Sequence, residues 1–153
     1  MRRLHLEIQR AISGCDLPTD KAFKRWVSGA LDASTRRADL TIRLVDRAES
    51  AHLNEVYRNK KGPTNVLSFA YDPLPGIDSD LLGDLAICAP LVSREAAEQG
   101  KPEQAHWAHL VVHGILHLRG YDHENPRQAQ AMETLEREIL ARLGVPDPYG
   151  LDD

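Results

Sequence analysis

The chain has 153 residues, of which 42% are hydrophobic and 27% are charged, and its formal net charge is −4. This length and composition are ordinary for one globular domain with a substantial core. The negative balance argues against a general nucleic-acid binder, because such proteins are typically basic, so any polyanion would need a local basic patch.

Two features of the sequence bear on the compartment of the protein. No apolar run approaches membrane-spanning length, and the first residues lead into a strand pattern rather than a signal core. Cys15 and Cys88 match no C-x-x-C spacing, so we expect buried free thiols in a reducing compartment. We therefore predict a cytoplasmic protein that does not interact with membranes.

The apolar residues alternate between the two-residue period of strands and the 3.6-residue period of helices. In chain order the pattern predicts a strand at 4–8, a helix at 22–31, a strand at 40–44, a helix at 46–57, strands at 66–69 and 85–87, and helices at 90–100, 102–118 and 126–143. Residues 72–80 hold two prolines, a glycine and three aspartates, which predicts a loop or hairpin tip. We expect residues 1–153 to form one α+β domain with flexible last residues. A small four-stranded mixed sheet would pack with about five helices, including a central histidine-bearing helix.

The helix expected at 46–57 has marked ends. Asp46 is followed three residues later by Glu49, which resembles a capping box. Three cations, Arg58, Lys60 and Lys61, follow at its C-terminus. They are explained equally well by favourable placement against the helix dipole and by a phosphate clamp. In a clamp, the planar guanidinium would bind phosphate bidentately, and the two lysines would add substrate binding.

Residues 102–118 predict a buried helix, because Pro102 suits a first turn and the following residues are largely apolar. At about 100° per residue, four histidines of this helix fall within a sector of about 80°. They are His106, His109, His113 and His117. A lone buried histidine is usually a hydrogen-bonded packing residue. For His106 and His109 this interpretation and a role in lining or supporting a site stay equally open, and we retain His109 as a candidate substrate-binding residue.

The run His113-Gly-Ile-Leu-His117-Leu-Arg-Gly-Tyr-Asp-His123 spaces three imidazoles as H-x3-H-x5-H. The first two histidines lie one above the other on a helix face. Gly120 can adopt the left-handed conformation that ends helices, so the chain can turn back and bring His123 towards them. Three imidazoles and a free fourth position are typical of a catalytic zinc site, so we predict one zinc ion per chain. The same open site would fit nickel or copper.

The residue after the first ligand separates this motif from H-E-x-x-H proteases, where a glutamate is the general base. Here Gly114 cannot take a proton, which argues against peptide hydrolysis. We expect this glycine to let a bulky substrate approach the metal. Asp122 either orients a histidine from behind or is a solvated loop aspartate.

Together with the histidine run, the stretch Tyr57-Arg-Asn-Lys-Lys-Gly-Pro-Thr-Asn-Val-Leu-Ser-Phe69 resembles the YbeY family of bacterial rRNA-maturation metalloproteins. The resemblance covers about residues 40–143 and includes the Gly83-Asp84 strand. It implies zinc held by the three motif histidines, RNA handling by Arg58, and single-strand-specific endoribonuclease activity. It also implies 16S rRNA 3′-end maturation and ribosome quality control, with single-stranded RNA and the small ribosomal subunit or associated factors as partners. The N-terminal third departs most from the family.

The expected mechanism joins the metal and the arginine. Zinc would bind a water or a phosphate oxygen of RNA, and Arg58 would neutralise the charge that develops as the phosphodiester breaks. The nucleophile is either that water or the RNA 2′-hydroxyl, and no residue is assigned as general base. Two alternatives remain: a zinc hydrolase acting on another substrate class, and a non-catalytic ribosome-assembly factor in which zinc stabilises the fold. The second predicts a fourth protein ligand, such as His109 or Asp122.

Overall fold

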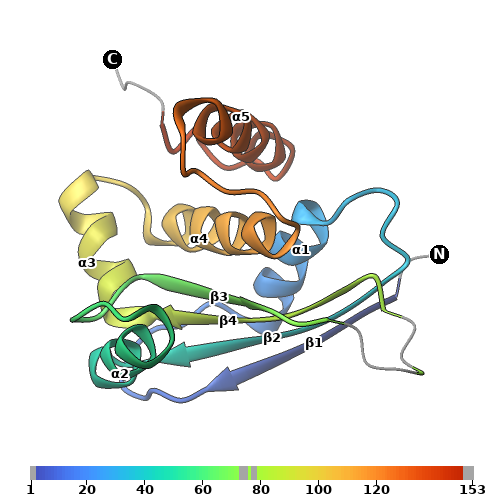
Figure 1. Cartoon of the computed structure of the whole chain (residues 1–153). Helices are drawn as coiled ribbons and strands as arrows, with labels where there is room; N and C mark the ends of the chain where they lie inside the picture. The colour runs from blue at the N-terminus through green and yellow to red at the C-terminus, as the bar shows by residue number, and fades with distance from the viewer. Residues whose placement is uncertain (1–2, 73–75, 77–78, 150–153) are drawn as a thin grey trace.

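The computed structural model describes residues 3–72, 76 and 79–149. A four-stranded sheet with the order β1-β2-β4-β3 forms its base (Figure 1). The strands are β1 Arg3–Arg10, β2 Arg37–Val45, β3 Val66–Ala70 and β4 Leu81–Cys88. β1, β2 and β4 run parallel, whereas β3 pairs antiparallel with β4. The expected mixed sheet of four strands is therefore confirmed, and β3 is one of its edges.

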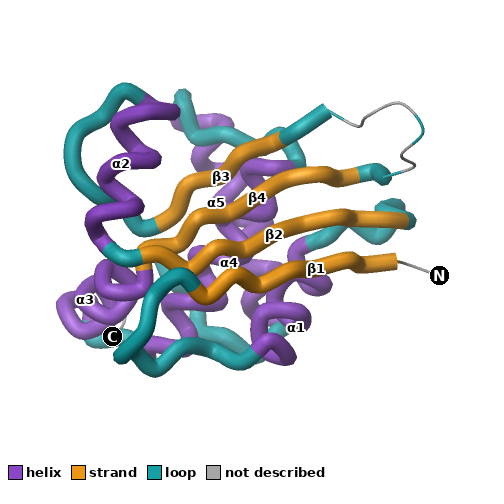
Figure 2. Tube along the Cα trace, turned by 90° about the horizontal axis from the view of Figure 1, so that it is seen from below, coloured by secondary structure: helices purple, strands orange, loops and turns teal. Residues whose placement is uncertain are grey.

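The described part of the chain forms five helices, as expected. They are α1 Asp20–Ala30, α2 Arg47–Arg58, α3 Ala89–Gln99, α4 Glu103–Leu118 and α5 Pro126–Arg142. Figure 1 shows α1 and α4 against one face of the sheet and α5 as an outer layer on α4. Figure 2 looks onto the opposite face, where α2 lies at one end and most of the strand surface is left uncovered by helices.

Helix α4 is central because it is buried on nearly every side. Its neighbours are β3, β4, α1, α3 and α5. Gly114 sits where α4 crosses β4, and a Cβ atom there would stand 2.7 Å from Leu85 Cδ2. The expectation that Gly114 opens a path for substrate is therefore wrong. The glycine faces the sheet, and its missing side chain allows the close approach of helix and strand.

Three smaller expectations are corrected or limited. Cys88 is buried, but Cys15 is exposed, because it lies in the loop after β1 rather than in the core. The capping box is half formed: Asp46 accepts the Glu49 backbone N–H, but the Glu49 carboxylate binds Arg43 instead of returning to the helix start. β3 and β4 form the expected hairpin, although residues 73–75 and 77–78 of its tip and the last residues 150–153 lie outside the described residues.

Among the described helices, none is both long and apolar enough to cross a bilayer.

Candidate metal centre

The end of α4 brings the three motif histidines together. Gly120 has φ +99°, and the Tyr121 N–H binds back to the Leu116 carbonyl at 3.0 Å, which closes the helix in a Schellman-type turn. The chain then reverses and places the His123 ring centroid 5.1 Å from that of His117. One nitrogen from each of His113, His117 and His123 lies within 4.8 Å of the others. The turn expected from the sequence therefore assembles the expected triad.

The nitrogens of His113 and His117 are arranged as metal ligands. His113 Nδ1 lies 3.1 Å from the Glu136 carboxylate, and His117 Nδ1 lies 3.0 Å from the Tyr121 carbonyl. Since both partners only accept, each Nδ1 must carry the proton, which leaves the Nε2 lone pairs free. These two Nε2 atoms face each other at 3.1 Å. Two nitrogens bound to one tetrahedral zinc lie about 3.3 Å apart, from zinc–nitrogen distances of about 2.0–2.1 Å.

Two facing lone pairs repel each other unless a cation lies between them. Burial lowers the pKa of His117, and the charges of His113 and His123 lower it further. A shared proton is therefore disfavoured, and a divalent ion meets the requirement. The donor set of three imidazoles fits zinc, and the two half-buried ligands, His113 and His117, have the hydrogen-bonded support that metal-binding histidines usually have.

Glu136 is the residue of this site that the sequence analysis missed. It lies on α5, which begins after the Asn125 cap, and its side chain is fully buried. One oxygen binds His109 Nε2 at 3.0 Å and His113 Nδ1 at 3.1 Å, and the other accepts the Tyr149 hydroxyl at 2.9 Å. Burial opposes ionisation, but the hydrogen bonds from the two histidines hold the pKa of Glu136 at about 2. The carboxylate is therefore ionised and fixes the His113 tautomer.

A signal for Glu136 was present in the apolar stripe of α5. Buried positions of this helix are Met132, Ile139 and Leu140, and Glu136 occupies the turn between them. A carboxylate at a buried helical position requires partners from another element. Here those partners are the histidines of α4.

His109, His113 and Glu136 form a second group that is close enough to hold a cation. This group shares His113 with the first but uses its other nitrogen. Tyr149 covers it, with its hydroxyl 3.2 Å from His109 Nε2, and burial raises the pKa of that hydroxyl, helped by Glu136. Because His109 Nε2, His113 Nδ1 and the Tyr149 hydroxyl are all bonded to Glu136, the group supports the open triad.

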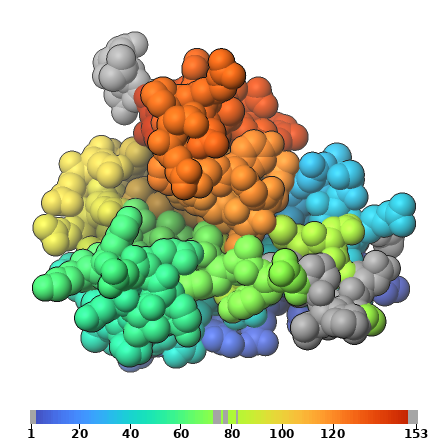
Figure 3. All heavy atoms as spheres, viewed as in Figure 1, coloured from blue at the N-terminus to red at the C-terminus, as the bar shows by residue number. Residues whose placement is uncertain are grey.

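A cavity of about 800 Å³ opens over the triad. Arg58 and Lys60 line it together with the three histidines, whereas Lys61 and His109 are not among its lining residues. Arg58 donates to the Ser68 carbonyl, and its Cζ lies 5.2 Å from the Phe69 ring centroid. Figure 3 shows the two walls on one face, the green segment that contains β3 and the orange segment of α4 and the turn after it.

Asp122 also lies in this cavity, but its carboxylate accepts the backbone N–H of His123. It therefore supports the turn that carries the third ligand. His106 is separate from the site: it is 3% exposed and binds Glu95 through Nε2 at 2.8 Å. Burial lowers the pKa of His106, against the influence of Glu95.

Comparisons with known proteins identify the family of the chain. A family model described as "Endoribonuclease YbeY" matches residues 9–144. An endoribonuclease YbeY of Alkalilimnicola ehrlichii is 58% identical over 98% of this chain and 93% of its own length, and one of Pseudomonas entomophila is 56% identical over 98% and 96%. A solution structure of a Thermotoga maritima protein has the same fold, with a TM-score of 0.52 and 21% identity over 95% of this chain and 99% of its own.

Proposed function

The chain belongs to the YbeY family of endoribonucleases, and from this premise we propose that it is a zinc-dependent, single-strand-specific endoribonuclease. Its substrate would be rRNA, and its role would be 16S rRNA 3′-end maturation and ribosome quality control in the cytoplasm. The small ribosomal subunit or associated factors would be its partners. One zinc ion per chain would bind to His113, His117 and His123.

The facing Nε2 atoms of His113 and His117 are the observation that supports this proposal most strongly. Their protons are held at Nδ1, so the two Nε2 lone pairs are free to bind a cation. A substrate in the cavity can reach a cation bound there. When bound, zinc supplies Lewis-acid polarisation of a phosphoryl oxygen and lowers the pKa of a water molecule. Glu136 and the Tyr121 carbonyl fix the orientation of His113 and His117 by accepting hydrogen bonds from their Nδ1 atoms.

Arg58 is proposed as the catalytic residue that meets the phosphate. It lies in the same cavity as the triad, at the end of α2. The Ser68 carbonyl and the Phe69 ring hold its guanidinium in a set orientation, which reduces the entropy lost when it binds an anion. Its remaining donors can pair bidentately with phosphate and neutralise the charge that develops as the phosphodiester breaks.

Lys60 and Lys61 are proposed as supporting contacts. Both are exposed and follow Arg58 in the chain, and Lys60 lines the cavity. An exposed ammonium group on a flexible stem neutralises phosphate without fixing its geometry. His109 stays a candidate substrate contact, although its Nε2 is bonded to Glu136 and Tyr149.

The experiment that tests the proposal compares Arg58→Lys with Lys60→Ala and Lys61→Ala in zinc-loaded protein. Arg58→Lys retains the charge but loses the planar fork, so cleavage of unstructured RNA should fall at least tenfold. The two lysine variants should weaken RNA binding modestly and flatten its salt dependence. Metal content and melting temperature should match wild type in all three. Full activity of Arg58→Lys would rule out the clamp, and cleavage of ester or peptide panels in place of RNA would overturn the proposed function.

A further inference from the structure

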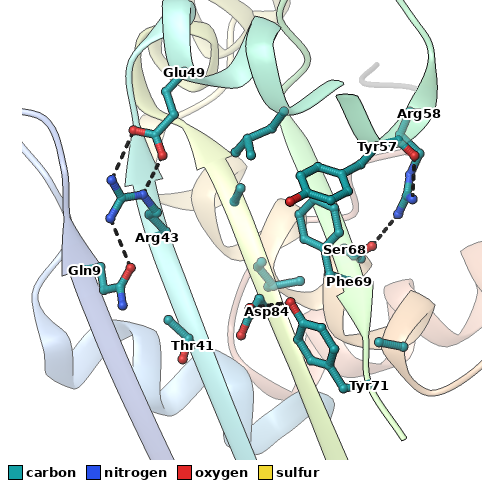
Figure 4. Close-up of a pocket in the computed structure, with 14 residues that line it drawn as sticks. Gln9, Thr41, Arg43, Glu49, Tyr57, Arg58, Ser68, Phe69, Tyr71 and Asp84 are labelled. Atoms are coloured by element: carbon teal, nitrogen blue, oxygen red, sulfur yellow. Dashed lines mark hydrogen bonds and ion pairs between the residues drawn. The ribbon is translucent and has the colours of Figure 1, made fainter. Parts of the chain in front are cut away.

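A second cavity, of about 640 Å³, lies on the sheet face opposite α4 (Figure 4). Its floor comes from β2, β4 and β3, through residues such as Thr41, Asp84 and Phe69. It shares three lining residues with the metal cavity: Arg58, Ser68 and Ala70. The two cavities therefore meet at the edge strand β3. None of the three motif histidines lines the sheet-face cavity.

Exposed aromatic rings mark this cavity. Among the described residues, the large hydrophobic side chains most exposed to solvent are Val56, Tyr57 and Tyr71, at 57%, 59% and 53%. Both tyrosines line the cavity. The Tyr57 ring meets the Phe69 ring edge-on, with centroids 5.3 Å apart, which holds it upright at the cavity wall. Exposed rings held in place are suited to stacking against a flat ligand.

The polar groups of the cavity are paired with one another. Arg43 binds Glu49 and also donates to Gln9, and the Tyr71 hydroxyl donates to Asp84 at 2.8 Å. Figure 4 shows Arg43, Gln9 and Thr41 on one side, facing the rings on the other. Because Arg43 is paired with Glu49, and Arg58 lies at the edge shared with the metal cavity, the interior lining of this cavity offers no unpaired cation to a phosphate. It suits an uncharged group that carries hydrogen-bond donors and acceptors at its edge.

We propose that this sheet-face cavity binds an unstacked nucleobase of the RNA strand whose phosphodiester lies at the metal centre. The inference rests on the proposed function, and it adds a subsite for the base that neighbours the cleaved bond. Arg58 supports the connection, because it lines both cavities and lies over β3 at Phe69. Since β3 is an edge strand, a single-stranded RNA can cross it from one face to the other. A paired base cannot stack on Tyr57, so the subsite would also favour single strands.

The test uses zinc-loaded full-length protein and single-stranded RNA oligonucleotides that each carry 2-aminopurine at one position. Fluorescence before cleavage reports stacking, and cleavage kinetics are measured on the same oligonucleotides. Wild type should quench the probe at one or two positions beside the cleaved bond. Tyr57→Ala should remove this quenching and raise KM about tenfold with little change in kcat, since base–aromatic stacking contributes about 1–3 kcal/mol. Tyr57→Phe, which keeps the ring, should behave as wild type.

Val56→Ala is the matched control, because Val56 is an equally exposed neighbour on α2 that lines neither cavity. Tyr71→Ala is a second variant from the other end of the cavity, and it should shift KM in the same direction. Melting temperatures verify that all variants fold. If quenching and KM are unchanged in both alanine variants while wild type cleaves RNA, the base subsite is overturned and the proposed function stands. The exposed rings would then be assigned to contact with a protein partner. Wild-type protein that neither cleaves nor quenches would overturn the proposed function together with the subsite.

Discussion

Two of the histidine–carboxylate pairs of helix α4 have different roles. In the first, Glu95 of α3 binds His106 Nε2 and leaves Nδ1 buried without a partner among the described residues. In the second, Glu136 of α5 binds His113 Nδ1 and leaves Nε2 facing the cavity. The two histidines lie seven residues, or about two turns, apart on the same helix face. In these two pairs, the nitrogen that the carboxylate binds decides whether the other nitrogen is buried in the core or turned towards the cavity.

The largest effect should come from removing the ligands themselves. His113→Ala and His117→Ala should each reduce zinc from about one ion per chain to almost none, whereas His106→Gln should keep it. Because metal bound to the folded state adds stability, about 2.7 kcal/mol at a free concentration of 100 Kd, a chelator should lower the melting temperature of wild type and His106→Gln. It should have little effect on His117→Ala. Elemental analysis and thermal melting provide the measurements, and full zinc in His113→Ala would refute the assignment.

An intermediate effect is expected from the two carboxylates. Glu136→Gln should lower zinc affinity about 10- to 100-fold, because His113 loses the charged acceptor that orients it. Glu95→Gln should leave the affinity within about twofold of wild type, while the free energy of unfolding falls by about 1 kcal/mol, because His106 then bonds to a neutral acceptor in place of a charged one. Competition with a zinc-chelating dye measures the affinity, and urea melts of the metal-free proteins measure the stability. Equal losses of affinity in both variants would remove the distinction between the pairs.

The smallest effect concerns pH. Burial lowers the pKa of His106, so the folded state favours its neutral form, while the unfolded chain takes up a proton below about pH 6.5. In metal-free protein, the contribution of His106 to the free energy of unfolding should therefore be fully present above about pH 6.5 and should decline as the pH falls below it. This residue contributes at most about 1.4 kcal/mol per pH unit. His106→Gln should show a shallower decline in urea melts from pH 7 to 5. An identical slope would mean that folding does not lower the pKa of His106.

The sequence predicted the parts of the site that depend on local geometry. Helical spacing aligned His113 with His117, and a glycine at position 120 implied the turn that returns His123. The sector of four imidazoles on α4 was also correct, but it did not separate His106 from the ligands. Their partners come from α3 and α5, and a sequence does not show which helix will pack where. Glu136 was missed for this reason: its place in the apolar stripe of α5 indicated burial, but the sequence did not show that the histidines of α4 would be its partners.

The strand order and the close packing at Gly114 were beyond the sequence for a related reason. Alternating apolar residues identified each strand, yet the position of β3 at the edge depends on its antiparallel pairing with β4. That position places Arg58 between two cavities. The glycine was interpreted through its neighbour His113, whereas its role is set by Leu85 on a distant segment.

We expect a metal ion to bind His113 through Nε2, on the side of the ring away from Glu136. Anomalous diffraction at the zinc edge from crystals grown with zinc tests this most directly. We predict one peak about 2.0–2.1 Å from a nitrogen of each of His113, His117 and His123, with a fourth ligand that is not a protein side chain. A peak between His109, His113 and Glu136, or a fourth position filled by a side chain such as Asp122, would contradict it.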